Sequence, residues 1–207
     1  MVADVAVDSG YSVLGMVDDR AKVPRLEITF PFLGGRDWLL SQGRDEFFCA
    51  LGVGDNLARK AIARFLLAEG FVLATLISRF AVISPFAKLG SGTVVMPCAA
   101  VNCSTAIGDG VIVNTGAVVE HDCKVRDYTH LAPNSTLGGG VEVGESSLVG
   151  IGATVMPYLR VGSHSIVGAG SLVSRAIPDY ATAVGVPARI MRRAAQPPRE
   201  DNQEIDR

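Results

Sequence analysis

Between Ile83 and Val173 the chain has an aliphatic residue at every sixth position. All of these positions are Ile, Leu or Val, and no insertion interrupts the series. A second series lies four residues after each aliphatic position, and most of its members are small: Ala87, Thr93, Ala99, Thr105, Val111, Ala117, Cys123, Thr129, Ser135, Val141, Ser147, Ala153, Leu159, Ser165, Ser171 and Ile177. Because side chains two apart on a strand point to the same side, each small residue points inward together with the aliphatic residue that follows it.

This six-residue period predicts a hexapeptide β-helix, in which short strands alternate with turns. Glycine often follows the aliphatic position, as at Gly90, Gly108 and Gly138, and it suits the backbone of tight turns. Three hexads close one triangular coil, so the series predicts about five stacked coils over residues 81–177. The stacked coils are expected to bury a continuous column of aliphatic side chains.

Residues 1–80 show a different pattern, in which short apolar runs alternate with amphipathic segments. The expected elements are a buried strand from Val13 to Val17, a short helix after Gly34-Gly35, a strand from Phe47 to Val53, a helix from Asn56 to Glu69 and a strand from Phe71 to Ile77. Asp55 is placed to cap the long helix, and the polar face of that helix is expected to carry Arg59, Lys60 and Arg64. The alternation predicts a small, parallel, Rossmann-like α/β unit.

Parallel α/β units bind ligands at the carboxyl ends of their strands. Asp18 and Asp19 follow the first expected strand, and Gly54 follows the second. These three residues are therefore candidates for contact with a ligand, although acids at a strand end can also serve only to solvate it.

The repeat ends at Ile177-Pro178, because proline cannot donate to a strand ladder. Residues 178–193 are expected to form a C-terminal cap. Residues 194–207 are polar and contain proline, which predicts a disordered tail.

Composition excludes several classes of function. The net charge of −2 gives no electrostatic reason to expect binding to nucleic acid or to an anionic membrane. The chain has neither a signal peptide nor an apolar run of membrane-spanning length. Its four cysteines form no CxxC pair, so no metal site is expected. Together these features predict a reduced, cytoplasmic location.

The chain has three histidines, at positions 121, 130 and 164. The repeat places His121 at a corner of the prism, His130 in the middle of a flat face and His164 in a turn. A solvated surface role is the ordinary interpretation of each. His121 and His130 are too far apart along one coil to reach the same small substrate, so they could share one only if different subunits supplied them. A triangular column suits three-fold packing, which predicts a homotrimer.

The segment from Asn114 to Asp122, with Glu120-His121-Asp122, continues to His130-Leu131-Ala132-Pro133. Together with Val184-Gly185-Val186-Pro187-Ala188-Arg189, it resembles the family of sialic acid O-acetyltransferases and bacillosamine-type UDP-amino-sugar N-acetyltransferases. The resemblance covers residues 2–193. It implies a left-handed β-helix enzyme that uses acetyl-CoA as the acyl donor and needs no metal.

The resemblance also implies roles for single residues of the β-helix. His121 matches the general base, a task that suits histidine because it exchanges protons near neutral pH. Asp122 matches the acid that orients this base. His130 matches a contact to acetyl-CoA, and Gly139 matches a backbone N–H beside the thioester carbonyl. Ile151 and Ala169 match positions along the pantetheine path.

In the N-terminal unit, Asp18, Asp19 and Gly54 match positions that hold the nucleotide-sugar. The strand and glycine–histidine loop that the family has before Val2 do not precede it in this sequence. We therefore expect the reading frame to continue upstream, with an apolar strand and a glycine-rich loop.

The function that the resemblance implies is acetyl transfer to the amine of a UDP-linked 4-amino sugar in surface-glycan synthesis. O-acetylation of a sialic acid is an alternative that uses the same base. A catalytically impaired scaffold subunit is a second alternative, because of the missing N-terminal strand. A metal-dependent carbonic anhydrase is disfavoured, since the three histidines lack the close pair that such a site usually has.

Overall fold

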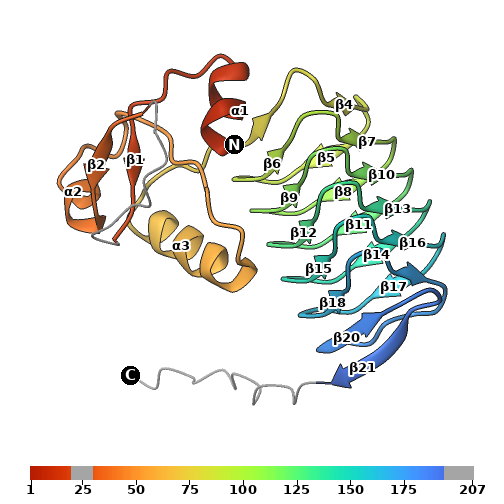
Figure 1. Ribbon diagram of the computed structural model, residues 1–207. Helices are drawn as coiled ribbons and strands as arrows, with labels where there is room; N and C mark the ends of the chain where they lie inside the picture. Colours follow the sequence, from red (N-terminus) through yellow and green to blue (C-terminus); the bar gives the residue numbers. More distant parts are fainter. Residues whose placement is uncertain (20–29, 194–207) are drawn as a thin grey trace, which may run out of the picture.

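The computed structural model describes residues 1–19 and 30–193, and the predicted disordered tail at 194–207 lies outside the described residues. A column of stacked two-residue strands stands beside a small N-terminal unit (Figure 1). The column is the predicted β-helix.

Three parallel sheets form the sides of the column. Face A consists of β4 (Val82–Ile83), β7 (Ala100–Val101), β10 (Val118–Val119), β13 (Thr136–Leu137), β16 (Thr154–Val155) and β19 (Leu172–Val173). Face B consists of β5 (Lys88–Leu89), β8 (Ala106–Ile107), β11 (Lys124–Val125), β14 (Glu142–Val143) and β17 (Arg160–Val161). Face C consists of β3 (Leu76–Ile77), β6 (Val94–Val95), β9 (Ile112–Val113), β12 (His130–Leu131), β15 (Leu148–Val149), β18 (Ile166–Val167), β20 (Ala181–Val184) and β21 (Arg189–Arg193), the last of which is antiparallel to β20.

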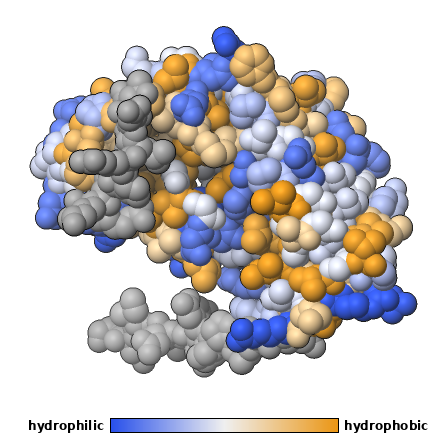
Figure 2. Space-filling view, in the orientation of Figure 1, coloured by the Kyte–Doolittle hydropathy of each residue, from blue (hydrophilic) through white to orange (hydrophobic). Residues whose placement is uncertain are grey.

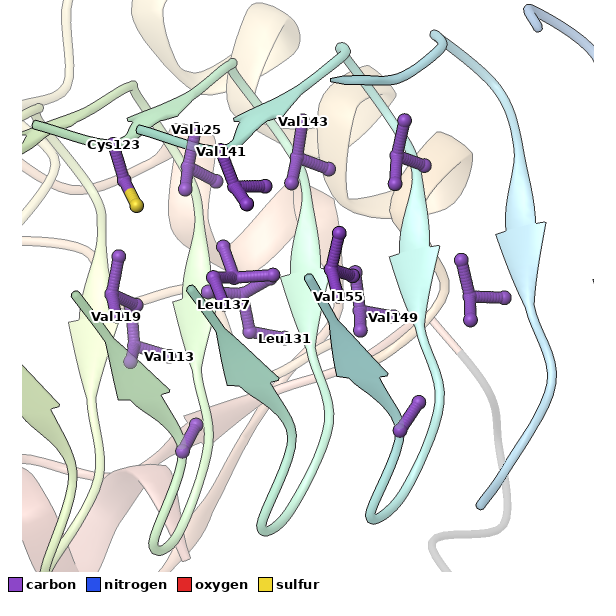
Figure 3. Packing of buried hydrophobic residues seen from close by; sticks show 14 of the residues in the cluster. Val113, Val119, Cys123, Val125, Leu131, Leu137, Val141, Val143, Val149 and Val155 are labelled. Atoms are coloured by element: carbon purple, nitrogen blue, oxygen red, sulfur yellow. The ribbon is translucent and has the colours of Figure 1, made fainter. Parts of the chain in front are cut away.

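The register of the coils places like residues on top of one another. Val119 pairs with Leu137, and Val125 pairs with Val143, so each partner lies 18 residues further along the chain. Figure 3 shows these side chains pointing into the interior of the column. The predicted aliphatic series therefore forms one continuous core, and its members from Val113 to Val173 are almost completely buried.

Most hydroxyl groups of the small inward series form hydrogen bonds with the neighbouring coil. Thr93 Oγ1 donates to the Gly108 carbonyl at 2.7 Å, Thr129 Oγ1 to Gly144 at 2.9 Å and Ser147 Oγ to Gly162 at 2.6 Å. A buried hydroxyl without a partner is costly, whereas these bonds repay its desolvation. The hydroxyls of Thr93, Thr129 and Ser147 are thus tolerated inside the column because each donates to a turn carbonyl 15 residues further along, whereas Ser135 Oγ is buried without a partner among the described residues.

The N-terminal unit contains α1 (Val2–Asp8), β1 (Met16–Val17), β2 (Phe32–Gly34), α2 (Arg36–Leu40) and α3 (Asn56–Ala68). The expected helix after Asp55 is confirmed, and the Asp55 carboxylate accepts from the Ala58 N–H at 2.8 Å. Gly70, with a φ of +84°, follows the end of this helix.

The strand predictions for this unit are largely wrong. The buried strand predicted from Val13 to Val17 is reduced to β1, which pairs only with β2 in the described residues and leaves Val17 38% exposed. The strand predicted from Phe47 to Val53 is a single bridge between Cys49 and Leu73. Each segment has too few neighbouring strands to pair with, so neither forms a longer strand.

The third expected strand, Phe71–Ile77, belongs in part to the β-helix. Only Leu76–Ile77 forms a strand, and β3 pairs with β6 of face C. The first rung of the column is therefore N-terminal to the predicted boundary at residue 81. Ile77 lies one hexad before Ile83, so it continues the aliphatic series by one step.

The helix α3 lies beside face C (Figure 1). Arg59, expected on its polar face, is only 1% exposed because it points into the contact with the β-helix and donates to the carbonyls of Gly110 and Tyr128, both at 2.7 Å. Lys60 forms an ion pair with Glu145, and Arg64 is exposed. Part of the polar face that the sequence predicts for α3 therefore contacts the β-helix.

The surface carries both hydrophobic and hydrophilic side chains. Figure 2 shows hydrophobic side chains on the side of the β-helix that faces the viewer and a hydrophilic band over β21, which carries the exposed Arg189 and Arg192. Among residues 1–19 and 30–193, no helix is long and apolar enough to cross a membrane.

We expect Leu137→Ala to lower the free energy of unfolding by about 2–5 kcal/mol, because it leaves a cavity in the fully buried column. Urea unfolding at neutral pH measures this change. The matched variant Leu67→Ala truncates a side chain of α3 that is 50% exposed, and its cost is expected to stay below about 1 kcal/mol. Equal costs for the two variants would contradict the packing described here.

Candidate active site

The corner between faces A and B carries the residues with acid–base chemistry. In successive coils it is formed by Glu120-His121-Asp122, then Gly138-Gly139-Gly140, then Met156-Pro157-Tyr158. The glycine row has no side chains, so it forms a shelf between a polar row and a largely apolar one. Tyr158 is 78% exposed at the edge of this shelf.

His121 and Asp122 form a hydrogen-bonded pair above the shelf. His121 Nδ1 lies 2.8 Å from Asp122 Oδ2, and a carboxylate only accepts, so Nδ1 carries the proton. Asp122 has a φ of +61°, a left-handed conformation that is uncommon for residues other than glycine. Both side chains are exposed, and His121 Nε2 has no hydrogen-bond partner among residues 1–19 and 30–193. The pair therefore has the arrangement of a general base and the residue that orients it.

Gly139 lies directly under the imidazole ring of His121. A Cβ on Gly139 would come 2.7 Å from both Cε1 and Nε2 of that ring. The Gly139 carbonyl accepts from the Tyr158 N–H at 2.9 Å, while no acceptor faces its own N–H in the part of the chain that the structure describes. At another corner, the N–H groups of Ser91 and Asp109 are instead capped by the carboxylates of Asp109 and Asp127. A donor without a partner among the described residues thus lies beside His121.

His130 lies on β12 of face C, which is the side of the column opposite the A–B corner. Asn114 Oδ1 accepts from the Thr115 N–H at 2.8 Å, which turns its Nδ2 toward His130 Nε2 at 3.0 Å. An amide NH₂ only donates, so Nε2 accepts and Nδ1 carries the proton. The ring also forms a hydrogen bond with the backbone of Gly54. His130 is thus held between the β-helix and the N-terminal unit.

Burial lowers the pKa of His130 to about 4, and the positive charge of Arg59 acts in the same direction. The hydrogen bond to Gly54 opposes this shift without cancelling it. His130 is therefore neutral at physiological pH, in agreement with the tautomer that Asn114 selects.

Ile151 and Ala169 are exposed and stacked at the corner between faces C and A. A Cβ on Gly150 would lie 2.7 Å from the backbone N of Ala169, which shows how closely these turns approach. Both residues are on a different corner from His121. Within one chain the predicted site residues of the β-helix therefore lie at three places: the A–B corner, face C with His130, and the C–A corner.

The candidate residues of the N-terminal unit lie at two places. Asp19 follows β1 and accepts from the Arg36 N–H at 2.7 Å, and it also forms an ion pair with the Arg36 guanidinium at 3.0 Å. Asp18 continues the β1–β2 ladder through its N–H, which donates to the Gly34 carbonyl. Gly54 precedes the cap of α3 and meets His130.

Two residues of the site region were given no role from the sequence, Arg59 and Asn114. Asn114 begins the segment that carries the family resemblance, so its position in that segment could have indicated a role in the site. Arg59 gave none, because an arginine in the first turns of a helix is usually solvated. Among residues 1–19 and 30–193, no group of three or more His, Cys, Asp or Glu residues is arranged to hold a metal ion.

Comparison with known families matches both halves of the chain. Residues 104–139 match the bacterial transferase hexapeptide family (six repeats), and residues 1–66 match the PglD N-terminal domain. Serine acetyltransferase from Haemophilus influenzae is 33% identical over 109 residues, which are 47% of this chain and 41% of that protein. The chain thus spans less than half the length of this curated relative.

Solved structures match over nearly the whole chain. The acetyltransferase domain of PglB from Neisseria gonorrhoeae is 37% identical with a TM-score of 0.87, covering 92% of this chain and 93% of that one. Perosamine N-acetyltransferase (PerB) from Caulobacter crescentus, solved with CoA and GDP-perosamine, is 39% identical with a TM-score of 0.86, covering 91% of this chain and 90% of that one.

The fold and these matches define the class as left-handed β-helix acyltransferases of the hexapeptide type. The chain belongs to the hexapeptide-repeat sugar acetyltransferase family, with an N-terminal domain of the PglD type.

We expect the protein to lose stability as the pH falls from about 6.5 to about 4. An unfolded histidine takes up a proton near pH 6.5, whereas folded His130 does so only near pH 4. Between these values the unfolded state binds more protons, so the free energy of unfolding falls by up to roughly 3 kcal/mol. Below pH 4 this contribution stays constant.

Urea unfolding of the wild type and of His130→Gln at several pH values isolates this contribution from that of the carboxylates. The variant is expected to lose less stability over the same interval, whereas the control His164→Gln, in a turn at another corner, should follow the wild type. Parallel curves for wild type and His130→Gln would show that His130 is not held neutral.

Proposed function

We propose that the protein transfers the acetyl group of acetyl-CoA to the amine of a nucleotide-linked amino sugar. The observation that carries this proposal is the His121–Asp122 pair above Gly139, with a free Nε2 beside a free backbone N–H. A UDP-linked 4-amino sugar is the acceptor that the sequence resemblance favours. PerB, solved with GDP-perosamine, makes a GDP-linked amino sugar the second acceptor to test.

The reaction follows from these groups. The amine nitrogen attacks the thioester carbonyl carbon and a C–N bond forms, while His121 Nε2 takes a proton from the nitrogen. The Gly139 N–H stabilises the oxygen that becomes negative in the tetrahedral intermediate. The C–S bond then breaks, and the CoA thiolate leaves and receives the proton from His121. Asp122 holds the ring in the tautomer that this sequence of steps needs.

We expect His121→Ala to lower turnover by roughly 10²–10⁴-fold, the usual contribution of a general base. CoA release is measured with a UDP-linked 4-amino sugar, a GDP-linked amino sugar and a sialic acid as acceptors. Because His121 is exposed, the urea midpoint should not change. The control His164→Ala removes a histidine that stacks on Tyr180 away from this corner, and it should keep full turnover.

Turnover of His121→Ala at the wild-type rate would refute the assigned base. Turnover with sialic acid alone would make the protein an O-acetyltransferase. Binding of acetyl-CoA without turnover of any acceptor would identify a scaffold subunit.

The proposed active form is a homotrimer packed through face A. The outward side chains of face A carry no charge: Val82, Ala100, Val118, Thr136, Thr154 and Leu172. Those of face B are mostly charged: Lys88, Ala106, Lys124, Glu142 and Arg160. Face C is covered in part by the N-terminal unit, where Leu76 and Val94 are almost completely buried. Face A is thus the side best suited to contact another copy of the chain.

This packing would also complete the site. Face A lies between the corner that carries His121 and the corner that carries Ile151 and Ala169. If face A of each copy points to a three-fold axis, the first corner of one protomer adjoins the second corner of the next. The predicted site residues of these two corners, which are apart within one chain, would then line one groove.

We expect Ala100→Glu on face A to reduce trimer content and turnover together, because a charge in an uncharged interface is costly. Ala106→Glu, one hexad later on face B, is the matched control and should change neither. Light scattering measures the mass and CoA release measures the activity. A fully active monomer, in either the wild type or Ala100→Glu, would refute the shared site.

A further inference from the structure

The contact between α3 and the β-helix depends on a series of turn carbonyls. Gly110, Tyr128 and Ser146 occupy the same corner in three successive coils, and all have positive φ values of +60°, +55° and +55°. Their carbonyls accept from side chains of α3. Arg59 donates to Gly110 and Tyr128, and Asn56 donates to Ser146 at 3.2 Å.

Arg59 holds the loop before its own helix with the same guanidinium group. Nη1 donates to the carbonyls of Val53 and Gly54, both at 3.1 Å, and Nη2 donates to Asn56 Oδ1 at 2.8 Å. No carboxylate pairs with it among the described residues. Burial lowers the pKa of Arg59 to about 10, so the group is still charged at neutral pH. One buried cation thus joins the Gly54 loop to two coils.

Gly54 is the point where this contact meets His130. The backbone of Gly54 bonds both with Arg59 and with the imidazole of His130, whose other nitrogen is held by Asn114. Of the ionisable groups around His130, Arg59 on α3 is the one whose charge acts on the ring. The position and the proton of His130 therefore depend on the same residue that fixes Gly54.

We propose that Arg59 is a positioning residue that holds Gly54 of the N-terminal unit and His130 of the β-helix in one fixed geometry. The inference rests on the proposed function, in which Gly54 lies at the nucleotide-sugar and His130 at the acyl donor. Arg59 touches neither substrate in this scheme. It sets the distance between the two binding regions by fixing α3 to two successive coils, at Gly110 and Tyr128.

The test compares Arg59→Met, which removes the charge and the hydrogen-bond donors, with Arg59→Lys, which keeps a charge but loses the planar fork. Arg64→Met changes an exposed arginine of the same helix and is the matched control. We expect Arg59→Met and Arg59→Lys to lower kcat/KM for the nucleotide-sugar by about 100-fold, as a displacement of about 1 Å does in other enzymes. CoA-dependent protection against thermal unfolding should be largely kept, since most predicted acyl-donor contacts lie on the β-helix.

The second readout is independent of activity. Nitrogen NMR of the imidazoles reports the tautomer and the titration of His130. In Arg59→Met the His130 titration should move up toward pH 6.5 and its Nδ1–H tautomer should lose its preference, whereas Arg59→Lys should keep a lower titration point than Arg59→Met. Arg64→Met should match the wild type in both assays.

A folded Arg59→Met protein with an unchanged His130 titration would overturn the positioning role, whatever its activity. Changed titration with unchanged kcat/KM would also overturn it, because the geometry would then not matter for transfer. If wild-type protein transfers no acetyl group, the proposed function fails, and the NMR comparison still decides whether Arg59 controls His130. If Arg59→Met does not fold, Arg59→Lys supplies both readouts.

Discussion

The 18-residue register of the β-helix is the constraint on which the rest of the structure depends. Each coil places its inward residues on those of the coil before it, as Val119 on Val101 and Leu137 on Val119. Every turn is then stacked on an equivalent turn, so a residue's place in the hexad decides which corner or face it occupies. The positions of His121, of the glycine shelf and of the carbonyls that accept from α3 all follow from this stacking. A one-residue insertion would separate each of them from its partner.

Much of the fold and part of the site could be predicted because the repeat is local and periodic. An inward position needs only its place in a six-residue count, and His121, Asp122 and Gly139 then fall on one corner in adjacent coils. The N-terminal strands could not be predicted in the same way. A strand such as Val13–Val17 extends only where a neighbour supplies a ladder, and in the described residues β2 is its single partner. The apolar composition of a segment does not show whether it has such a neighbour.

Arg59 shows a second limit of local patterns. Its acceptors at Gly110 and Tyr128 are 51 and 69 residues away in the sequence, so no spacing within α3 indicates burial. His130 was correctly expected to point out of the prism, but its surroundings depend on where the N-terminal unit lies. The environment that keeps it neutral is formed by Asn114, Gly54 and Arg59, which come from three separate segments. Long-range docking of this kind is settled by complementary donors and carbonyls in three dimensions.

Gly139→Ala tests most directly whether His121 acts as the base above Gly139, because the substitution alters neither functional group. The added methyl would lie 2.7 Å from Cε1 and Nε2 of His121, so the ring must move. Gly139 does not have a positive φ, hence the backbone accepts alanine. If His121 is the base, Gly139→Ala loses about 100-fold or more in turnover with an unchanged urea midpoint. The control Gly52→Ala, whose added methyl meets no neighbouring atom, keeps full turnover. Wild-type turnover by a correctly folded Gly139→Ala protein would contradict the account.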